Sequence, residues 1–419
     1  MKKKLLLGFS MFLFASSNAA FAENELTSFE DDVITVYDRA RPEYDPRGIR
    51  AKSFILSPSL EVEGIYDDNI YAEESDEDDD FIIVVKPVLD IASNWSKHRA
   101  NLSIYGAFGF YNDSDSEDFE DYGIELDTRF DIVRNTYLKS IISYDREHEE
   151  RGSPESPSNS VKPIEYDDFL ATLGVVHKPG KMSFELNTGF RNLDYSDGKL
   201  ADDSVLDQDV RDRDEYGGYI NVGYEFMPNY EAFIEFGGDI REYDLAASSG
   251  KDSEGYYVVG GTEINISGKA KGRVYVGYME RDYDSDAYEG IDGVKFGGDL
   301  FWNITEITSL IAEVSRSIEE TFLTDYSGYT LTAANLTLEH ELKRNVLLAA
   351  TTGWDNYDYE GAGDEERDDD IIFAGVEAKY LINRNFSAGI GYEFEDRSSN
   401  VDGDDYSKNQ FIISAKAAF

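Results

Sequence analysis

The sequence closes on Phe411-Ile412-Ile413-Ser414-Ala415-Lys416-Ala417-Ala418-Phe419. One parity of this stretch is apolar throughout: Phe411, Ile413, Ala415, Ala417 and Phe419. The other parity carries the polar side chains of Ser414 and Lys416. An apolar residue at every second position predicts a β-strand with one apolar face and one more polar face. We expect Phe411, Ile413 and Phe419 to belong to a final strand that closes a sheet.

The same period of two recurs through most of the chain. Apolar and polar residues alternate in Tyr122–Ile132, Met182–Phe190, Gly218–Phe226, Ala232–Ile240, Val294–Trp302 and Phe386–Phe394. So many charges cannot be buried cheaply, so the polar face must meet water. Too few helices or second sheets are available to cover the apolar face. A bilayer outside and a wet lumen inside satisfy both faces, which predicts an all-β fold, a transmembrane antiparallel up-and-down β-barrel.

The connections between these segments alternate in length. Short turns such as Arg134–Thr136 exchange with longer acidic loops such as Asp67–Asp80 and Glu149–Glu165. Short periplasmic turns and longer outer loops are typical of bacterial barrels, and the segments count to about 18 strands, with 16 as the alternative. Pro58 and Pro87 fall inside the first two predicted strands, where each removes a backbone donor. We expect a bulge or a local break at both.

The amino-terminal part has a different character. Residues 1–22 read as a secretory signal peptide, with Lys2 to Lys4, a short apolar run and the cleavage pattern Ala20-Phe21-Ala22. Residues 23–52 lack alternation and are expected to form a short, irregular N-terminal periplasmic segment, with folding back into the barrel mouth left open. Residues 53–419 are the predicted barrel. The expected location is therefore the outer membrane of a Gram-negative cell.

Composition restricts the partners. The 419 residues carry a formal charge of −47, which excludes nucleic acid and argues against a bare anionic lipid surface. The chain has no cysteine and therefore needs no disulfide. Its 29 tyrosines and 25 phenylalanines fit a barrel better than a disordered acidic chain. Expected partners are outer-membrane lipid, lipopolysaccharide and, through the C-terminal strand, the barrel-assembly machinery.

Two stretches carry a family resemblance. They are Val33-Ile34-Thr35-Val36-Tyr37-Asp38-Arg39-Ala40-Arg41-Pro42-Glu43-Tyr44-Asp45-Pro46, continued by Gly48-Ile49-Arg50, and Ser57-Pro58-Ser59-Leu60-Glu61-Val62, followed by Tyr66-Asp67-Asp68-Asn69-Ile70-Tyr71-Ala72. The chain resembles the putative β-barrel porin type 2 family of alphaproteobacterial outer-membrane proteins. The resemblance implies an outer-membrane β-barrel, and for some members a link to exopolysaccharide secretion. It supplies no catalytic residues.

Parity also predicts which charged side chains line the lumen. These are Glu125, Asp127, Arg129, Glu185, Arg191, Glu225, Glu235, Asp239, Arg241, Lys295, Asp299, Glu377, Lys379, Glu393 and Glu395. Rings of charge set ion selectivity in water-filled pores, and acids outnumber bases here, so we expect a preference for cations or neutral solutes. The alternative is that these groups pair across strands and fill the lumen.

The remaining chemical groups give weaker signals. The acidic runs Glu73–Asp80, Asp364–Asp370 and Asp402–Asp405 could bind Ca²⁺ or Mg²⁺ loosely, although none has the spacing of an EF-hand. No other cofactor, specific metal site or catalytic residue is predicted. Only His148 is expected near the loop end, and we interpret it as a surface residue, so no enzyme is expected.

Three functions remain open at this point. The first is a porin-like channel that serves as the exit pore of an exopolysaccharide pathway, with a periplasmic polysaccharide-export protein as its partner. The second is a general diffusion porin for small cationic or neutral solutes. The third is a structural or surface barrel whose acidic loops hold divalent cations.

Overall fold

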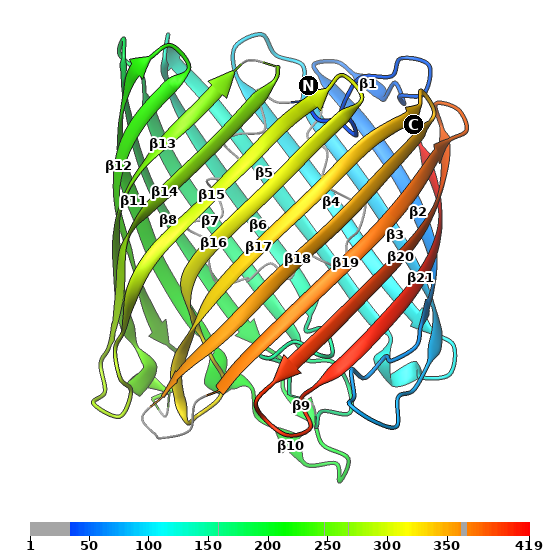
Figure 1. Cartoon of the computed structure of the whole chain (residues 1–419), viewed down its shortest axis with the longest axis vertical. Helices are drawn as coiled ribbons and strands as arrows, with labels where there is room; N and C mark the ends of the chain where they lie inside the picture. The colour runs from blue at the N-terminus through cyan, green and yellow to red at the C-terminus, as the bar shows by residue number, and fades with distance from the viewer. Residues whose placement is uncertain (1–33, 158, 247, 267, 362–366) are drawn as a thin grey trace.

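The computed structural model describes residues 34–157, 159–246, 248–266, 268–361 and 367–419. This part of the chain forms an antiparallel barrel whose strands cross the wall obliquely (Figure 1). The main sheet has 19 strands, and the 18 other than the short β1 close into the wall, with almost no helix. The predicted all-β barrel of about 18 strands is confirmed, and the alternative of 16 is wrong.

The wall strands follow one another in chain order. They are β2 (Phe54–Asp67), β3 (Asp80–Ser93), β4 (Arg99–Tyr111), β5 (Phe119–Val133), β6 (Thr136–His148), β7 (Glu165–His177), β8 (Met182–Tyr195), β11 (Arg213–Met227), β12 (Tyr230–Tyr243), β13 (Ser253–Ile266), β14 (Ala270–Tyr283), β15 (Ile291–Thr305), β16 (Thr308–Glu320), β17 (Tyr326–Lys343), β18 (Val346–Gly361), β19 (Arg367–Leu381), β20 (Phe386–Ser399) and β21 (Tyr406–Ala418). Outside the wall lie β1 (Ile49–Ala51), the hairpin β9 (Gly198–Lys199) and β10 (Val205–Leu206), and the 3₁₀ turns η2 (Asp115–Glu117), η3 (Asp209–Arg211) and η4 (Ser249–Lys251).

The barrel closes where the last strand meets the first. Strand β21 pairs antiparallel with β2, from Ser59 opposite Ala418 to Asp67 opposite Gln410. Phe411 and Ile413 lie in this strand and point away from the lumen, with 56% and 62% of their surface exposed. Phe419 follows the strand and donates its backbone N–H to the carbonyl oxygen of Pro58 at 3.1 Å.

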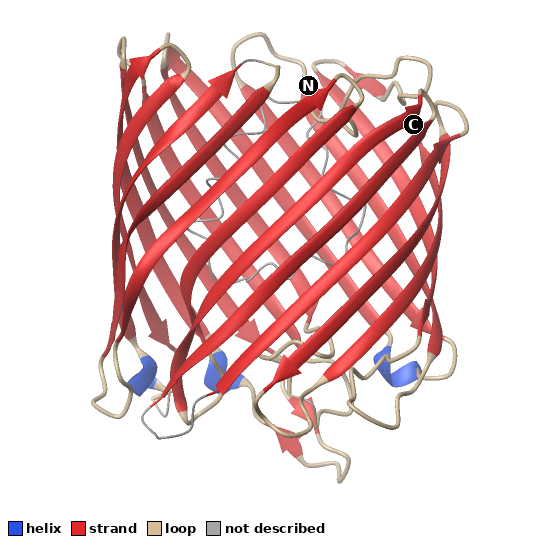
Figure 2. Ribbon diagram, viewed as in Figure 1, coloured by secondary structure: helices blue, strands red, loops and turns tan. Residues whose placement is uncertain are grey.

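The two ends of the barrel differ. At the upper end in Figure 2 the strands join through short turns, and we call this the short-turn end. Asn135, Gly180 and Asn229 hold positive φ angles there, which asparagine and glycine adopt readily. The lower end, which we call the long-loop end, carries the three 3₁₀ turns and the β9–β10 hairpin (Figure 2). By the asymmetry of bacterial barrels, the short-turn end is periplasmic and the long-loop end extracellular.

The outer surface is apolar and the inner surface polar. In β12, Ile234 and Phe236 are each 58% exposed, whereas Glu235 between them is 3% exposed. A water-soluble sheet would show the opposite burial, because it buries its apolar residues. The apolar side chains of this wall therefore need a lipid surround, and the polar ones face the lumen. No helix in the described ranges is long and apolar enough to cross a membrane.

The two prolines have different effects. Pro58 pairs with Leu89 of β3 without any register shift, and on its other edge the neighbour of β2 changes from β1 to β21. Beside Pro87 the β3–β4 ladder omits two positions and resumes at Val88 in the same register. The ladder is thus broken locally at Pro87, and neither proline produces a bulge. The predicted signal peptide, residues 1–22, lies outside the described residues, as do residues 23–33 of the predicted periplasmic segment.

Candidate functional site: the barrel lumen

The predicted lumen residues lie on β5, β8, β11, β12, β15, β19 and β20, between the exposed apolar positions of those strands. Most of them contact residues that parity alone does not connect. Asp127 pairs with Arg99 at 3.4 Å, and Glu185 pairs with Lys139 at 2.5 Å. Among the predicted residues themselves the structure joins Asp239 and Arg241, 3.1 Å apart. The rest are spread along the wall and over different heights.

One side of the lumen is lined by buried arginines, and we call it the arginine wall. It consists of Arg191 on β8, Arg213 on β11, Arg241 on β12, and Arg273 and Arg281 on β14, each at most 4% exposed. Each guanidinium has a carboxylate partner: Asp168 at 2.7 Å from Arg191, Glu215 at 2.8 Å from Arg213, Glu320 at 2.7 Å from Arg241, Glu235 at 2.8 Å from Arg273, and Asp239 beside Arg281. Buried charges persist in proteins when they are paired in this way.

The other side presents carboxylates, and we call Glu61, Glu63, Glu377 and Glu393 the carboxylate wall. Glu61 on β2 pairs with Lys416 on the neighbouring strand β21 at 3.0 Å. Glu63 on β2 pairs with Lys86 on the other neighbouring strand, β3, at 2.6 Å. Glu377 accepts a hydrogen bond from the phenol of Tyr37 at 3.2 Å. Glu393 is only 2% exposed, and neither of its carboxylate oxygens has a hydrogen-bond partner in the described chain.

The described part of the connection between β6 and β7, residues 149–157 and 159–164, crosses the lumen at the long-loop end (Figure 1). Glu155 in this loop accepts hydrogen bonds from the backbone N–H of Phe322 at 2.9 Å, from Thr321 Oγ1 at 3.0 Å and from the phenol of Tyr359 on β18 at 2.7 Å. Nine strands separate β6 from β18 in one direction around the barrel and seven in the other. Glu155 is therefore held against the wall opposite the strands from which its loop arises.

Further contacts fix the first part of this loop. Near its start, Glu149 pairs with Arg211 of η3. Arg151 pairs with Glu117 of η2 at 2.8 Å. The carbonyl oxygen of Gly152 accepts hydrogen bonds from Arg397 Nη1 on β20 at 3.2 Å and from the phenol of Tyr406 on β21 at 3.3 Å. Burial raises the pKa of Glu155 above that of an ordinary glutamate, although its hydrogen bonds oppose this effect.

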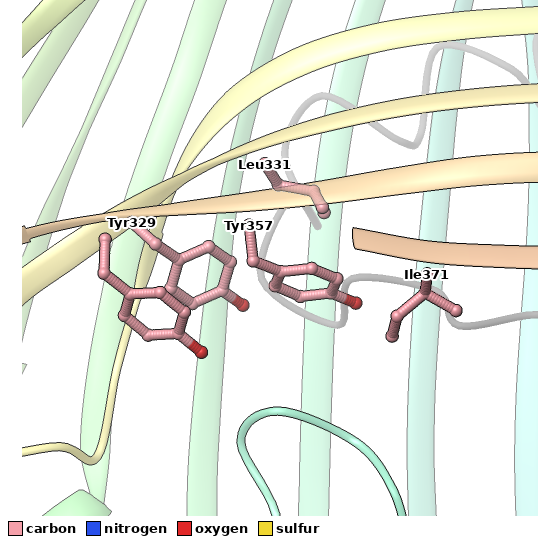
Figure 3. Packing of buried hydrophobic residues seen from close by; sticks show 5 residues of the cluster. Tyr329, Leu331, Tyr357 and Ile371 are labelled. Atoms are coloured by element: carbon pink, nitrogen blue, oxygen red, sulfur yellow. The ribbon is translucent and has the colours of Figure 1, made fainter. Parts of the chain in front are cut away.

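An aromatic cluster on β17, β18 and β19 contacts the crossing loop. Tyr329 and Leu331 on β17, Tyr357 and Tyr359 on β18 and Ile371 on β19 are all buried, and Figure 3 shows the labelled members side by side. The ring centroids of Tyr329 and Tyr359 are 5.1 Å apart. These inward tyrosines pack against one another, and Tyr359 turns its hydroxyl to Glu155. The cluster thus serves as an anchor for the crossing loop.

A second segment narrows the short-turn end. The backbone N–H of Val36 donates to Ser309 Oγ at 2.8 Å, and that of Tyr37 donates to Glu339 at 2.9 Å. Arg41 is 2% exposed and pairs with Glu341 at 2.8 Å. Burial and then the Glu377 carboxylate raise the pKa of the Tyr37 phenol, so it stays protonated and can donate. This part of the N-terminal segment lies on the inner surface of β16, β17 and β19.

Several charged residues of the lumen are absent from the set predicted by strand alternation. Glu61, Glu63, Lys86, Arg213, Glu215, Arg273, Arg281, Glu320 and Lys408 belong to this group. Alternation in their strands was available as a signal, but their partners lie on other strands. The interpretation of His148 as a surface residue is wrong: its side chain is 8% exposed, stacks on Phe119 and contacts Asp121 Oδ1 at 2.9 Å. It is the last residue of β6 and lines a cavity together with the carboxylate wall.

The acidic runs are partly structural. Asp80 is 2% exposed and accepts hydrogen bonds from the backbone N–H groups of Asp113 and Ser114. Asp404 pairs with Arg367 at 2.8 Å, and residues 364–366 are outside the described ranges. In the described chain, Asp197, Asp207 and Asp209 are the group whose carboxylates approach within 4.8 Å of one another, and all three are exposed.

The sequence matches one known protein family over most of its length. Residues 41–419 match the family described as putative beta-barrel porin 2. The chain belongs to this family. The family assignment agrees with the resemblance found in the sequence, and it makes the protein an outer-membrane β-barrel of porin type. None of the curated proteins matches the chain.

Solved structures of other barrels are similar at low sequence identity. The Pseudomonas aeruginosa OccK3 (OpdO) structure is 12% identical, with 87% of this chain and 96% of that chain covered and a TM-score of 0.44. P. aeruginosa OccK1 (OpdK) is 10% identical, with 87% and 99% covered and a TM-score of 0.43. A mutant of the P. aeruginosa ferric enterobactin receptor (PfeA) is 9% identical, with 87% and 80% covered and a TM-score of 0.47.

Proposed function

We propose that this family member is a non-enzymatic channel for small water-soluble solutes in the outer membrane of a Gram-negative cell. The observation that carries the proposal is the loop of residues 149–164, which crosses a polar lumen and is held on the far wall by Glu155. A loop in this position reduces the cross-section through which a solute must pass. The lumen around it is lined with charged groups, as a path for hydrated solutes requires.

The two walls support a preference for cations. Each guanidinium of the arginine wall has a carboxylate partner, so this wall contributes little net positive charge. On the carboxylate wall neither carboxylate oxygen of Glu393 has a hydrogen-bond partner in the described chain. The sequence as a whole carries −47 formal charges. Unbalanced negative charge along a narrow, water-filled path raises the local concentration of cations.

The first experiment is single-channel conductance of the purified, signal-cleaved protein in a planar bilayer, with the reversal potential in a KCl gradient. We expect small, steady conductance steps and a cation-preferring reversal potential. A second variant, with residues 150–160 replaced by a short Gly-Ser linker, should conduct more. Silence of both proteins would reject a channel and favour a structural barrel, whereas anion preference would reject the proposed selectivity.

Export of an exopolysaccharide is a second proposal, and it rests on the family resemblance. A polymer needs a wider path than a small solute, so the 149–164 loop would have to leave the lumen during export. Its contacts with the far wall include three hydrogen bonds that converge on Glu155, and these would have to break. Deleting the gene should then abolish extracellular polymer, and normal polymer levels in the deletion strain would reject this role.

A further inference from the structure

A cavity opens in the inner wall between the carboxylate wall and the aliphatic residues of β2, β3 and β21. Its volume is about 130 Å³. The carboxylate side of its lining includes Glu61, Glu63, Glu377 and Glu393. Gly389 and Gly391 also line it, on the same face of β20 as Glu393, so no side chain fills the wall beside that carboxylate. Except for Glu150 of the crossing loop, the lining residues lie on wall strands.

The state of Glu393 sets this cavity apart from the other charged sites in the lumen. The side chain is 2% exposed, and both oxygens are buried with no hydrogen-bond partner among the described residues. Lys86 and Lys408 act on it electrostatically, but Lys86 pairs with Glu63 at 2.6 Å and Lys408 lies 3.7 Å from Glu395. A buried carboxylate without a partner is costly, so a site that retains one is suited to a ligand that supplies the missing donor.

The rest of the cavity lining combines a group of apolar side chains with Asp121, His148 and Glu150. In the ladders, Ile412 is opposite Ile65, Ile65 is opposite Ile82, and Ile82 is opposite Tyr111, so one row of inward side chains runs across β21, β2, β3 and β4. Ile65, Ile82 and Val84 are at most 4% exposed and form a cluster on which Phe119 packs. Apolar groups on the inside of a water-filled barrel are exceptions to its polar lining, and they favour a ligand with an apolar body.

We propose that this cavity binds a small organic ammonium ion, with the ammonium group on Glu393 and a compact hydrocarbon body against Ile65 and Ile82. An ammonium group donates three hydrogen bonds and carries a positive charge that can pair with the Glu393 carboxylate. A divalent metal ion suits the site less well, because Ca²⁺ needs six to eight oxygen ligands, whereas Glu61 and Glu63 are already paired with lysines. A cavity of about 150 Å³ accepts benzene, so the hydrocarbon body should have about four to six carbon atoms.

The inference rests on the proposed function, since the ligand reaches the cavity through the lumen, but its test is separate from conductance. The probes are n-butylammonium, n-butanol and methylammonium, titrated by calorimetry into the detergent-solubilised full-length barrel. The first carries both features, the second lacks the charge, and the third lacks the hydrocarbon body. We expect n-butylammonium to bind at least tenfold more tightly than either of the others.

Three variants assign the binding to the cavity. Glu393→Gln should weaken n-butylammonium binding about tenfold or more and leave n-butanol unaffected, because charge-assisted hydrogen bonds are lost. Ile82→Ala should weaken n-butylammonium severalfold and leave methylammonium unaffected. Glu125→Gln, at a lumen carboxylate outside the cavity lining, should leave all three probes unaffected.

The outcomes separate this inference from the proposed channel. Equal affinity for n-butylammonium and n-butanol, or unchanged n-butylammonium binding in Glu393→Gln, would overturn the ammonium site even if the barrel conducts. Selective n-butylammonium binding that Glu393→Gln removes would support the site even if the barrel is silent in a bilayer, and that silence would count against the channel alone.

Discussion

The arginine wall and the carboxylate wall face the same lumen, yet they treat buried charge differently. In the arginine wall, a single guanidinium can have several carboxylates around it. That of Arg241 lies 3.1 Å from Asp239, 2.7 Å from Glu320 and 3.9 Å from Glu215. In the carboxylate wall, Glu393 is equally buried and has no hydrogen-bond partner in the described chain. Paired charges hold strands and loops together, whereas an unpaired one reduces stability. The difference suggests that one wall is structural and the other is available to ligands.

The largest effect is expected from breaking a pair in the arginine wall. Arg241→Ala removes the guanidinium 2.7 Å from Glu320 and leaves Asp239 with Arg281 as its guanidinium partner. Removing one partner of a buried pair costs about 3–5 kcal/mol. Urea unfolding of the refolded barrel in lipid vesicles measures the loss. The matched control is Arg129→Ala, because Arg129 is 36% exposed and its pair with Asp131 should contribute at most about 1 kcal/mol. Similar losses in both variants would remove the structural role assigned to this wall.

An intermediate effect is expected in the loop that joins the two sides. Burial raises the pKa of Glu155 in the docked loop, so the docked state binds a proton more tightly than an undocked, solvated state. Protonation below the ordinary glutamate pKa therefore stabilises docking fully, and this contribution is lost as the pH rises through the raised pKa. Conductance should fall as the pH is lowered. Glu155→Gln should remove most of this pH dependence, and an unchanged pH profile in that variant would place the titrating group elsewhere.

The smallest effect is expected from neutralising the unpaired carboxylate. Glu393→Gln removes a buried charge that has no hydrogen-bond partner in the described chain, so the free energy of unfolding should stay the same or rise by about 1 kcal/mol. Glu215→Gln in the arginine wall is the comparison, since Glu215 pairs with Arg213 at 2.8 Å and should cost about 2 kcal/mol or more. If Glu393→Gln destabilised the barrel as much as Glu215→Gln, the two walls would not differ in the way described.

The strand pattern could be predicted from the sequence, because alternation alone determines which side of a strand each residue faces. Ile234, Glu235 and Phe236 show this, since their exposures follow their parity. The contacts that shape the lumen could not be predicted in the same way. Glu155 meets Tyr359 across 204 positions, and Tyr37 meets Glu377 across 340. No local period connects such residues, so the crossing loop and the inward N-terminal segment appear only in three dimensions.

That Glu393 lacks a hydrogen-bond partner in the described chain could not be predicted from the sequence for a related reason. Parity placed Glu393 and Glu395 on the same face and gave them equal standing. In the structure Glu395 accepts a hydrogen bond from Tyr406 at 2.6 Å, and Glu393 accepts none from the described residues. On β21, Glu395 is opposite Lys408 and Glu393 is opposite Gln410. Gln410 donates its side-chain N–H to Asp67 of β2, so the pairing of the last strand with the first decides which groups are available to Glu393.

That meeting point has a consequence for how the barrel can be sealed. On one edge of β2, β1 occupies Phe54 to Leu56, and β21 occupies the stretch from Ser59 onward. Pro58 stands between them, and its carbonyl oxygen receives the backbone N–H of Phe419. If β21 were shifted further along β2, it would overlap β1, so β1 limits the register in which the last strand can pair with the first. Since stagger and strand number together determine the girth of a barrel, three residues near the start of the chain help to set the width of the whole pore.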